Sequence, residues 1–235
     1  MSRALTIDIW SDIMCPWCVI GYHNLAKALE ELKGEIDVTI RWMPFELNPD
    51  MPPEGEEQQA HLARKYGRSP GEASDMAGKM RAVGEQAGFP MHYHGEGDPP
   101  PAMMWNTFEA HKLLRWALAF AGPEAQTRLK LALFRAHFQF RRRIGERDVL
   151  LDIAAEEGLP RVGAAEALDD PGLGQAIRLE ERRAYDANIT GVPGMIVGGR
   201  FLIPGAQEPD VYFSTLRRMA DRLDVLAKRE AQAAG

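Results

Sequence analysis

The sequence has few cysteines and no long apolar segment. Two cysteines in 235 residues are too few for the disulfide scaffold of a small secreted protein, and too few for a zinc site unless histidines or carboxylates complete it. No stretch approaches the roughly 18 apolar residues of a membrane-spanning helix. The N-terminal residues show neither an apolar signal segment nor a small-residue cleavage site. We therefore expect a cytoplasmic protein.

The sequence also lacks a strong excess of either charge. Its 34 acidic and 28 basic residues are spread along the chain and give a formal net charge of -6. This balance argues against nucleic acid or an anionic membrane as the main partner. With 45% hydrophobic residues, the chain is long enough to bury a full core in one large domain, or in one domain with an insertion.

The spacing of the two cysteines is the most informative feature that the sequence does have. They enclose a proline and a tryptophan in the run Cys15-Pro16-Trp17-Cys18. Two cysteines placed at random in such a chain would stand three residues apart roughly one time in a hundred. A C-x-x-C motif is typical of proteins that exchange thiols with disulfides. We therefore predict this chemistry rather than a pair of inert core cysteines.

A strand, a helix and a second strand are predicted around the motif. Apolar residues alternate over residues 5–10 and again over residues 36–42, as they do in strands. Between them, residues 16–33 have apolar residues at helical spacing. Pro16 suits the first position of this helix and Gly34 suits its end. The motif thus lies at the strand-to-helix junction of a βαβ unit.

This junction predicts different roles for the two cysteines. A cysteine reacts as the thiolate, and its ordinary pKa of about 8.5 leaves it mostly protonated at neutral pH. Cys15 precedes the helix, where free N–H groups and the helix dipole favour a negative sulfur, so we predict it to be the exposed nucleophile. Cys18 lies on the apolar face with Tyr22 and Leu25 and is predicted to be the shielded resolving thiol.

The rest of the chain is predicted to be helical in its middle and mixed at its end. Residues 53–188 show helices and loops but no convincing strand. The helices cover residues 106–121, where Asn106-Thr107-Phe108-Glu109 forms a capping box, then a segment that opens at Pro123, then residues 148–157 and 171–187. Strands at 195–197 and 200–203 enclose a Gly198-Gly199 turn, and a helix begins at Pro209. The two ends therefore form β-α-β and β-β-α units, separated by an all-helical insertion.

Four segments resemble those of a known family. They are the motif with its continuation to Gly21, residues 41–49, residues 106–111, and Gly191-Val192-Pro193-Gly194 with residues 205–207. Together they resemble the FrnE-like branch of the DsbA oxidoreductase family, over nearly the whole chain. The resemblance implies an α/β fold in which a thioredoxin-like domain of residues 1–52 and 189–235 is interrupted by an all-helical insertion domain of residues 53–188.

The resemblance also implies a role for Pro193. In thioredoxin-like folds a cis-proline precedes a strand and faces the C-x-x-C motif, and Pro193 matches that position. A cis Val192–Pro193 bond would present the backbone of Val192 near Cys15, where a substrate strand could pair with it. We therefore predict that Pro16, Trp17, Val192 and Pro193 bind substrate.

The sequence departs from the family pattern at two points. The periplasmic oxidants of the family carry Pro-His between the cysteines, whereas this chain carries Pro-Trp and lacks a histidine there to stabilise the thiolate. Some FrnE-like proteins also have a second cysteine pair, which this chain does not have. Neither a strongly oxidising character nor relay of the disulfide to another internal pair is therefore predicted.

Three functions are compatible with these features. The leading hypothesis is a thiol–disulfide oxidoreductase that acts on protein or peptide substrates through a redox-active Cys15–Cys18 disulfide, with glutathione as a possible redox partner and with no metal or other cofactor. The alternative is a glutathione-dependent isomerase or transferase of the 2-hydroxychromene-2-carboxylate isomerase (kappa-class) type, in which Cys18 would be dispensable. The third is a holdase chaperone that binds unfolded chains through the helical insertion, independently of both cysteines.

Two groups of polar residues give weaker signals. Asp12 and Glu46 are candidates for a proton acceptor that assists Cys18, because one precedes the motif and the other follows the second strand. His92-Tyr93-His94 with Asp98 has the composition of a metal site. That segment is rich in glycine and proline and provides no further anchored ligand, so a surface loop is favoured.

Large apolar residues near the motif give a further signal. Ile13-Met14 and Trp17 adjoin the cysteines, and Met103-Met104-Trp105 has a similar composition within the insertion. Because methionine adapts to varied shapes, these segments are candidates for a patch that binds unfolded or peptide substrates. Core packing is the alternative explanation for these residues.

Overall fold

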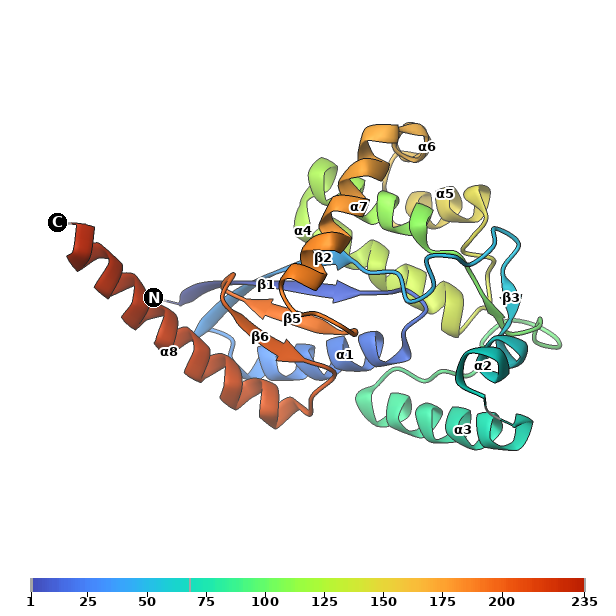
Figure 1. Ribbon diagram of the computed structural model, residues 1–235, viewed down its shortest axis with the longest axis horizontal. Helices are drawn as coiled ribbons and strands as arrows, with labels where there is room; N and C mark the ends of the chain where they lie inside the picture. Colours follow the sequence, from blue (N-terminus) through green and yellow to red (C-terminus); the bar gives the residue numbers. More distant parts are fainter. Residues whose placement is uncertain (1, 68, 235) are drawn as a thin grey trace.

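The sheet that carries the motif joins the two ends of the chain. Among residues 2–67 and 69–234, which this computed structural model describes, four strands form a sheet in the order β2-β1-β5-β6 (Figure 1). β1 is parallel to β2, while β5 is antiparallel to both β1 and β6. The strands are β1 (Arg3–Ser11), β2 (Ile36–Pro44), β5 (Gly194–Val197) and β6 (Phe201–Pro204). The predicted β-α-β and β-β-α units therefore meet in one thioredoxin-like sheet.

Two helices lie together on one face of this sheet. α1 (Pro16–Glu31) connects β1 to β2, and α8 (Pro209–Ala234) packs against it (Figure 1). α1 ends before the predicted Lys33, because the chain leaves the helix at Leu32 and turns at Gly34 with a φ of 82°. α1 starts at Pro16, as predicted, so the strand-to-helix junction lies at the C-x-x-C motif.

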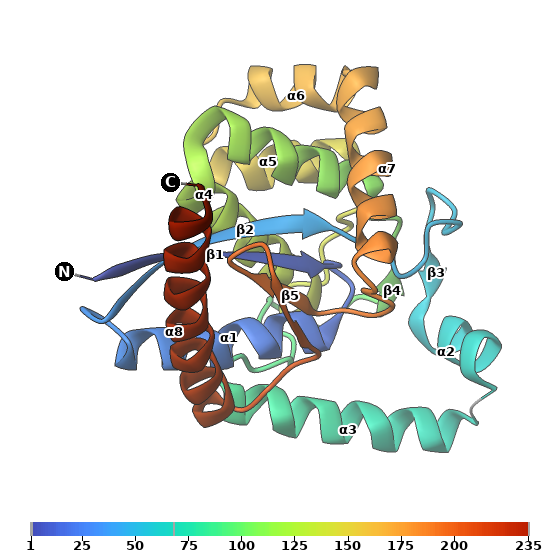
Figure 2. The same cartoon turned by 60° about the vertical axis from the view of Figure 1, so that its left-hand side comes forward.

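α7 (Pro171–Asp186) packs against the opposite face at the C-terminal ends of β1 and β2, where it stands beside their arrowheads in Figure 2. Its predicted N-cap is confirmed, since the side chain of Asp170 accepts a hydrogen bond from the backbone N–H of Gly172 at 2.7 Å. Ala184 of α7 packs with Trp10 of β1 in a small apolar cluster of its own. The sheet is therefore buried on this face only near the C-terminal ends of β1 and β2, whereas Asp37, Thr39 and Arg41 of β2 remain exposed to solvent.

A long helix, α4 (Phe108–Phe138), protects the outer edge of β2. The side chain of Gln126 accepts from the N–H of Trp42 at 2.9 Å and donates to its carbonyl at 2.8 Å, so it replaces a neighbouring strand there. Gly122 interrupts the helix with a φ of 87°, at the boundary that Pro123 predicted. The predicted capping box is wrong by one residue. The N-cap is Thr107 and not Asn106, and the side-chain oxygen of Asn106 accepts a hydrogen bond from the N–H of Phe108 at 3.0 Å.

The remaining elements complete the insertion and include a small sheet that was not predicted. β3 (Glu56–Glu57) and β4 (Met103–Met104) pair in antiparallel fashion, and at two residues each they are too short to show a periodicity. The helices are α2 (Gln58–Tyr66), α3 (Pro70–Ala87), α5 (Arg147–Glu156) and α6 (Arg161–Asp169). α3 packs against α1, whereas α5 and α6 pack on α4. The domain limits at residues 52/53 and 188/189 stay predictions.

Candidate active site

The two cysteines lie at the start of α1, in the geometry that a helix start imposes. Cys15 is the N-cap residue, with extended φ and ψ of -89° and 111°, and its carbonyl accepts from the N–H of Cys18 at 3.1 Å. Both thiols are free, and they are joined by a hydrogen bond between their sulfurs. Cys18 is fully buried as predicted, but Cys15 is only 3% exposed, so the expectation of an openly exposed nucleophile is wrong.

The loop before β5 reaches the same place from the other end of the chain. The sulfur of Cys15 lies 3.5 Å from the carbonyl oxygen of Val192, a residue 177 positions away. The Val192–Pro193 peptide bond is cis, and the Pro193 carbonyl accepts from the N–H of Gly205 at 2.8 Å. Pro193 also packs closely against Gly21 of α1. The structure thus brings the predicted residues Cys15, Val192 and Pro193 together.

A buried carboxylate supports the loop that precedes the cysteines. Asp12 has no solvent exposure and accepts hydrogen bonds from the N–H of Met14 at 3.2 Å and of Leu47 at 2.7 Å. Burial raises the pKa of Asp12, although these hydrogen bonds and the charge of Lys130 oppose the shift. His111 has its Nε2 3.9 Å from Asp12, and burial lowers the pKa of this imidazole well below its usual value. A buried carboxylate with a raised pKa beside two thiols can accept a proton from them.

Lys130 is a functional candidate that the sequence analysis missed. It comes from α4, has no solvent exposure, and its ammonium nitrogen lies 3.3 Å from the carbonyl of Ser11. Burial lowers the pKa of Lys130 to about 8, while the negative groups at Cys18, Asp12 and Cys15 act in the opposite direction. A signal was available in the sequence, since Lys130 precedes Phe134 by four residues and therefore shares the apolar face of the helix.

The sequence predicted a thiolate at Cys15, and the pKa shifts of the two cysteines differ from that prediction. The hydrogen bond to Cys18, followed by burial, raises the pKa of Cys15 well above its usual value. Burial also acts to raise the pKa of Cys18, but hydrogen bonds from Cys15 and Ser11 and the charge of Lys130 reverse the sign and leave it lowered. At Cys15 the backbone N–H of Cys18, in the first turn of α1, opposes this shift without reversing it. Both shifts act in the direction of a protonated outer sulfur and a negative inner sulfur.

The second predicted carboxylate lies elsewhere. Glu46 forms an ion pair with Arg178 of α7 and is almost wholly buried there. Burial and the neighbouring Glu181 raise the pKa of Glu46 to about 7, whereas Arg178 lowers it. Its interactions are with α7 and not with the thiols, so of the two candidates only Asp12 is in the cysteine cluster.

A cleft of about 480 Å³ opens onto the outer sulfur. Cys15, Pro16, Trp17 and Val192 line it on one side, and α2, α3 and β4 form the other, whereas the sulfur of Cys18 is not part of its wall. Six methionines line it: Met14, Met76, Met80, Met91, Met103 and Met104. All the residues of the predicted apolar patch except Ile13 lie in this cleft; Ile13 is fully buried in the core.

Two other features of the sequence can now be placed. His92 and His94 pack ring against ring, with their centroids 4.3 Å apart, in the segment between α3 and β4. In the part of the chain that the structure describes, no group of three or more His, Cys, Asp or Glu side chains is arranged to hold a metal ion. The same part contains no helix that is both long enough and apolar enough to cross a membrane.

A thioredoxin-like sheet that presents a C-x-x-C pair at the start of its first helix, beside a proline-flanked carbonyl, defines the class of DsbA-like oxidoreductases. The chain belongs to the DSBA-like thioredoxin domain family, whose model matches residues 6–217. It is 30% identical over 208 residues to an uncharacterized Bacillus subtilis (strain 168) protein, YwbO, and the match covers 88% of this chain and 92% of that protein.

Solved structures agree with this assignment. The probable DsbA oxidoreductase SCO1869 from Streptomyces coelicolor is 26% identical, with a TM-score of 0.81 over 91% of this chain and 89% of that chain. The cytosolic disulfide reductase DsbM from Pseudomonas aeruginosa with GSH has a TM-score of 0.58 at 21% identity, over 95% of this chain and 99% of that chain. A 2-hydroxychromene-2-carboxylate isomerase has a TM-score of 0.62 at 14% identity, over 98% of this chain and 100% of that chain. The last two similarities concern the fold alone.

Proposed function

We propose that this protein exchanges disulfides with thiol-containing protein or peptide substrates through Cys15 and Cys18. The observation that carries the proposal is the position of the two sulfurs. Cys15 lines the substrate-sized cleft and faces the carbonyl of Val192 at 3.5 Å, while Cys18 lies behind it, fully buried and in hydrogen-bond contact with Cys15. This order gives the outer sulfur access to substrate and the inner sulfur access only to its partner.

The first step uses the hydrogen bond between the two sulfurs. Cys18, whose pKa is lowered, accepts the proton of Cys15 as the Cys15 sulfur attacks one sulfur of a substrate disulfide. The substrate S–S bond breaks, a Cys15–substrate disulfide forms, and one substrate thiolate leaves. The proton acceptor for the nucleophile is therefore the second cysteine itself.

The second step closes the enzyme disulfide. Cys18 loses its proton and attacks the sulfur of Cys15, which forms the Cys15–Cys18 bond and releases the second substrate thiolate. We assign that proton to Asp12, which is buried close enough for its charge to act on Cys15 and whose pKa is raised by burial. Overall, the enzyme dithiol is oxidised, the substrate disulfide is reduced to two thiols, and the same steps in reverse oxidise a substrate dithiol.

The alternative function makes glutathione the reacting thiol. A fold neighbour named as a 2-hydroxychromene-2-carboxylate isomerase, and another crystallised with GSH, favour keeping this alternative. It assigns no task to Cys18, whereas in this structure Cys18 is hydrogen-bonded to Cys15 and its pKa is lowered by the groups around it. Turnover of an isomerase substrate by the Cys18→Ser variant, in the presence of glutathione, would support the alternative.

The test is exchange activity in the Cys15→Ser and Cys18→Ser variants, measured by insulin reduction and by oxidative refolding of a reduced substrate. Both variants should lose turnover. Cys18→Ser should in addition accumulate a mixed disulfide with the substrate, detectable by mass, because the first step remains and the second is blocked. If both variants keep full activity, or if Cys15→Ser forms the mixed disulfide, the proposed roles are wrong.

A further inference from the structure

The charged groups that line the cleft are all positive. Lys65 of α2, Arg81 of α3 and Arg141, which follows α4, contribute to its wall together with the methionines. Among the described residues, no aspartate or glutamate side chain lines it. The protein as a whole carries a formal net charge of -6, whereas the charged side chains that line the cleft beside Cys15 are positive.

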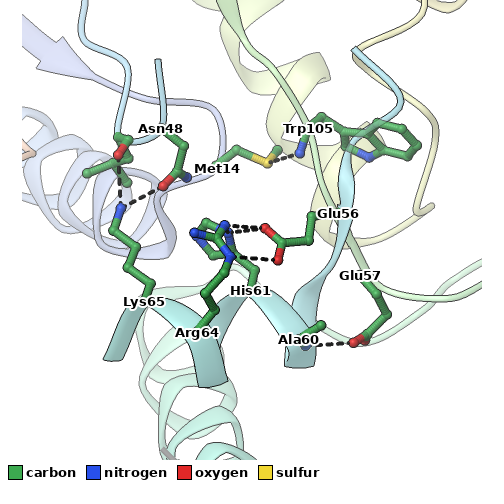
Figure 3. Close-up of polar contacts among 10 residues, drawn as sticks. Met14, Asn48, Glu56, Glu57, Ala60, His61, Arg64, Lys65 and Trp105 are labelled. Atoms are coloured by element: carbon green, nitrogen blue, oxygen red, sulfur yellow. Dashed lines mark hydrogen bonds and ion pairs between the residues drawn. The ribbon is translucent and has the colours of Figure 1, made fainter. Parts of the chain in front are cut away.

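Two acidic residues at the start of α2, which contributes to the wall of the cleft, are engaged with other groups, as Figure 3 shows. Glu56 binds the guanidinium of Arg64 at 2.6 Å and Nδ1 of His61 at 2.8 Å, and these hydrogen bonds lower the pKa of Glu56 to about 2. Glu57 caps α2 by accepting from the N–H of Ala60 at 2.8 Å. The charge of Glu56 is thus balanced by Arg64 and does not offset the cations of the wall.

The three cations retain hydrogen-bond donors for a ligand. Lys65 donates to the carbonyl of Leu47 at 2.9 Å and to the side chain of Asn48 at 2.6 Å, which leaves one of its three N–H bonds (Figure 3). Arg141 donates one N–H to the carbonyl of Pro100. Arg81 is exposed and makes no hydrogen bond or ion pair within the described part of the chain. A planar guanidinium in this state is suited to bind a carboxylate through two hydrogen bonds.

We propose that the cleft selects small disulfides and thiols that carry a carboxylate beside an apolar body. This inference rests on the proposed function, because the substrate sulfur must reach Cys15. The flexible methionine side chains contact the apolar part of the substrate. Arg81 and Lys65 bind the carboxylate of the substrate. A volume of about 480 Å³ lies within the range of small-molecule sites, so the substrate is a compact molecule or a short peptide. In its disulfide form it is the oxidant of the two-step exchange: its S–S bond is reduced to two thiols as the Cys15–Cys18 disulfide forms.

The test compares two aromatic disulfides of different charge, dithiobis(nitrobenzoate), which is a dianion, and dithiodipyridine, which is neutral. Their reaction with the reduced protein is followed by the absorbance of the released thiols. Arg81→Gln should lower the second-order rate constant for the dianion about threefold or more and leave that for the neutral probe unchanged. Arg218→Gln is the matched control, since Arg218 is exposed on α8, outside the lining of the cleft, and its replacement changes the net charge equally. Arg218→Gln should change neither rate.

Salt dependence provides a second measurement that needs no variant. A cationic cleft predicts that added salt slows the reaction with the dianion, whereas repulsion by a protein of net charge -6 would make added salt accelerate it. Equal effects of Arg81→Gln on the two probes, or acceleration of the dianion by salt, would overturn the selectivity proposed for the cleft. Failure of the proposed function would look different, because neither probe would then react at Cys15.

Discussion

The ammonium nitrogen of Lys130 lies 3.3 Å from the carbonyl oxygen of Ser11, at the end of the strand that leads to the cysteines. Lys130 belongs to the insertion and Ser11 to the thioredoxin-like sheet, so the two parts of the chain share one buried electrostatic environment. The charge of Lys130 helps to lower the pKa of Cys18, and burial in turn lowers the pKa of Lys130 to about 8. The insertion therefore contributes to the electrostatics of the thiol pair as well as to the wall of the cleft.

Replacing Lys130 should weaken the thiolate. In the Lys130→Met variant the cation that favours a negative Cys18 is gone, so the pKa at which the pair first ionises should rise. We expect the alkylation rate of the reduced protein at pH 7 to fall by about threefold to tenfold and the pH profile to move upward. The exposed Lys79→Met variant is the control. An unchanged profile in Lys130→Met would show that the thiolate does not depend on this lysine.

The same variant should change the pH dependence of stability. The folded protein loses the Lys130 proton near pH 8, and the unfolded chain keeps it to about 10.5, so Lys130 makes the wild-type free energy of unfolding rise between these values. At pH 7, Lys130→Met should be more stable by on the order of 2 kcal/mol, because a buried charge is replaced by an apolar chain of similar length. Urea unfolding of the reduced proteins at pH 7 and pH 10 measures this difference, which should shrink at the higher pH. A difference independent of pH would contradict the assignment.

Glu46 should affect stability without affecting the thiols. Folding raises its pKa to about 7 from an unfolded value of 4.5, so the stability that protonation provides is complete below about pH 4.5 and is lost as the pH rises through 7. Glu46→Gln keeps the neutral form. The variant should match the wild type near pH 4.5 and exceed it by on the order of 1 kcal/mol at pH 8 in urea unfolding. Loss of disulfide exchange in this variant would instead place Glu46 in the reaction.

Asp12→Asn should separate the two steps of the exchange. The negative charge of Asp12 raises the pKa of Cys15, so its removal should leave the first attack intact or make it faster at pH 7. Closure of the Cys15–Cys18 bond should slow by about tenfold or more, since the proton acceptor for Cys18 is lost. Rapid-quench analysis of the mixed disulfide and of the closed disulfide distinguishes the steps. Equal slowing of both steps would indicate a structural role, through the N–H groups of Met14 and Leu47.

Gly21 should prove necessary for the position of Pro193. A Cβ atom at residue 21 would lie 3.2 Å from the Pro193 ring and 3.3 Å from both Ala206 and the hydroxyl of Tyr212, which is tighter than ordinary contact. Alanine favours a helix over glycine by about 0.5–1 kcal/mol, which offsets part of the crowding. Gly21→Ala should therefore reduce exchange activity with little change in Tm. A variant with full activity would mean that the Pro193 loop tolerates displacement.

The sequence predicted the elements whose patterns are local. The alternation in β1 and β2, Pro16 at the start of α1, the Asp170 cap and the break at Gly122 all depend on neighbouring residues, and the structure agrees with them. β3 and β4 were missed because two residues have no period, and α2, α3 and α6 were not identified individually. The cytoplasmic location and the FrnE-like branch stay predictions.

The sequence predicted the two cysteines of the site but not the residues that surround them. The C-x-x-C spacing identifies Cys15 and Cys18, but which sulfur carries the charge depends on Ser11 and Lys130, which only the folded chain brings to Cys18. Glu46 was a reasonable candidate beside β2, and only the position of Arg178 on α7 shows why it lies elsewhere. The cleft likewise depends on the packing of α2 and α3 against the thioredoxin-like part, which no local pattern specifies.

The central claim is that Cys15 is the reacting sulfur, assisted by Cys18 behind it. The most direct measurement is limited alkylation of the reduced protein with iodoacetamide at neutral pH, followed by digestion and mass mapping of the labelled cysteine. The account predicts label on Cys15 and no label on Cys18 in the folded protein, because only the outer sulfur lines the cleft. Label first on Cys18 would contradict it.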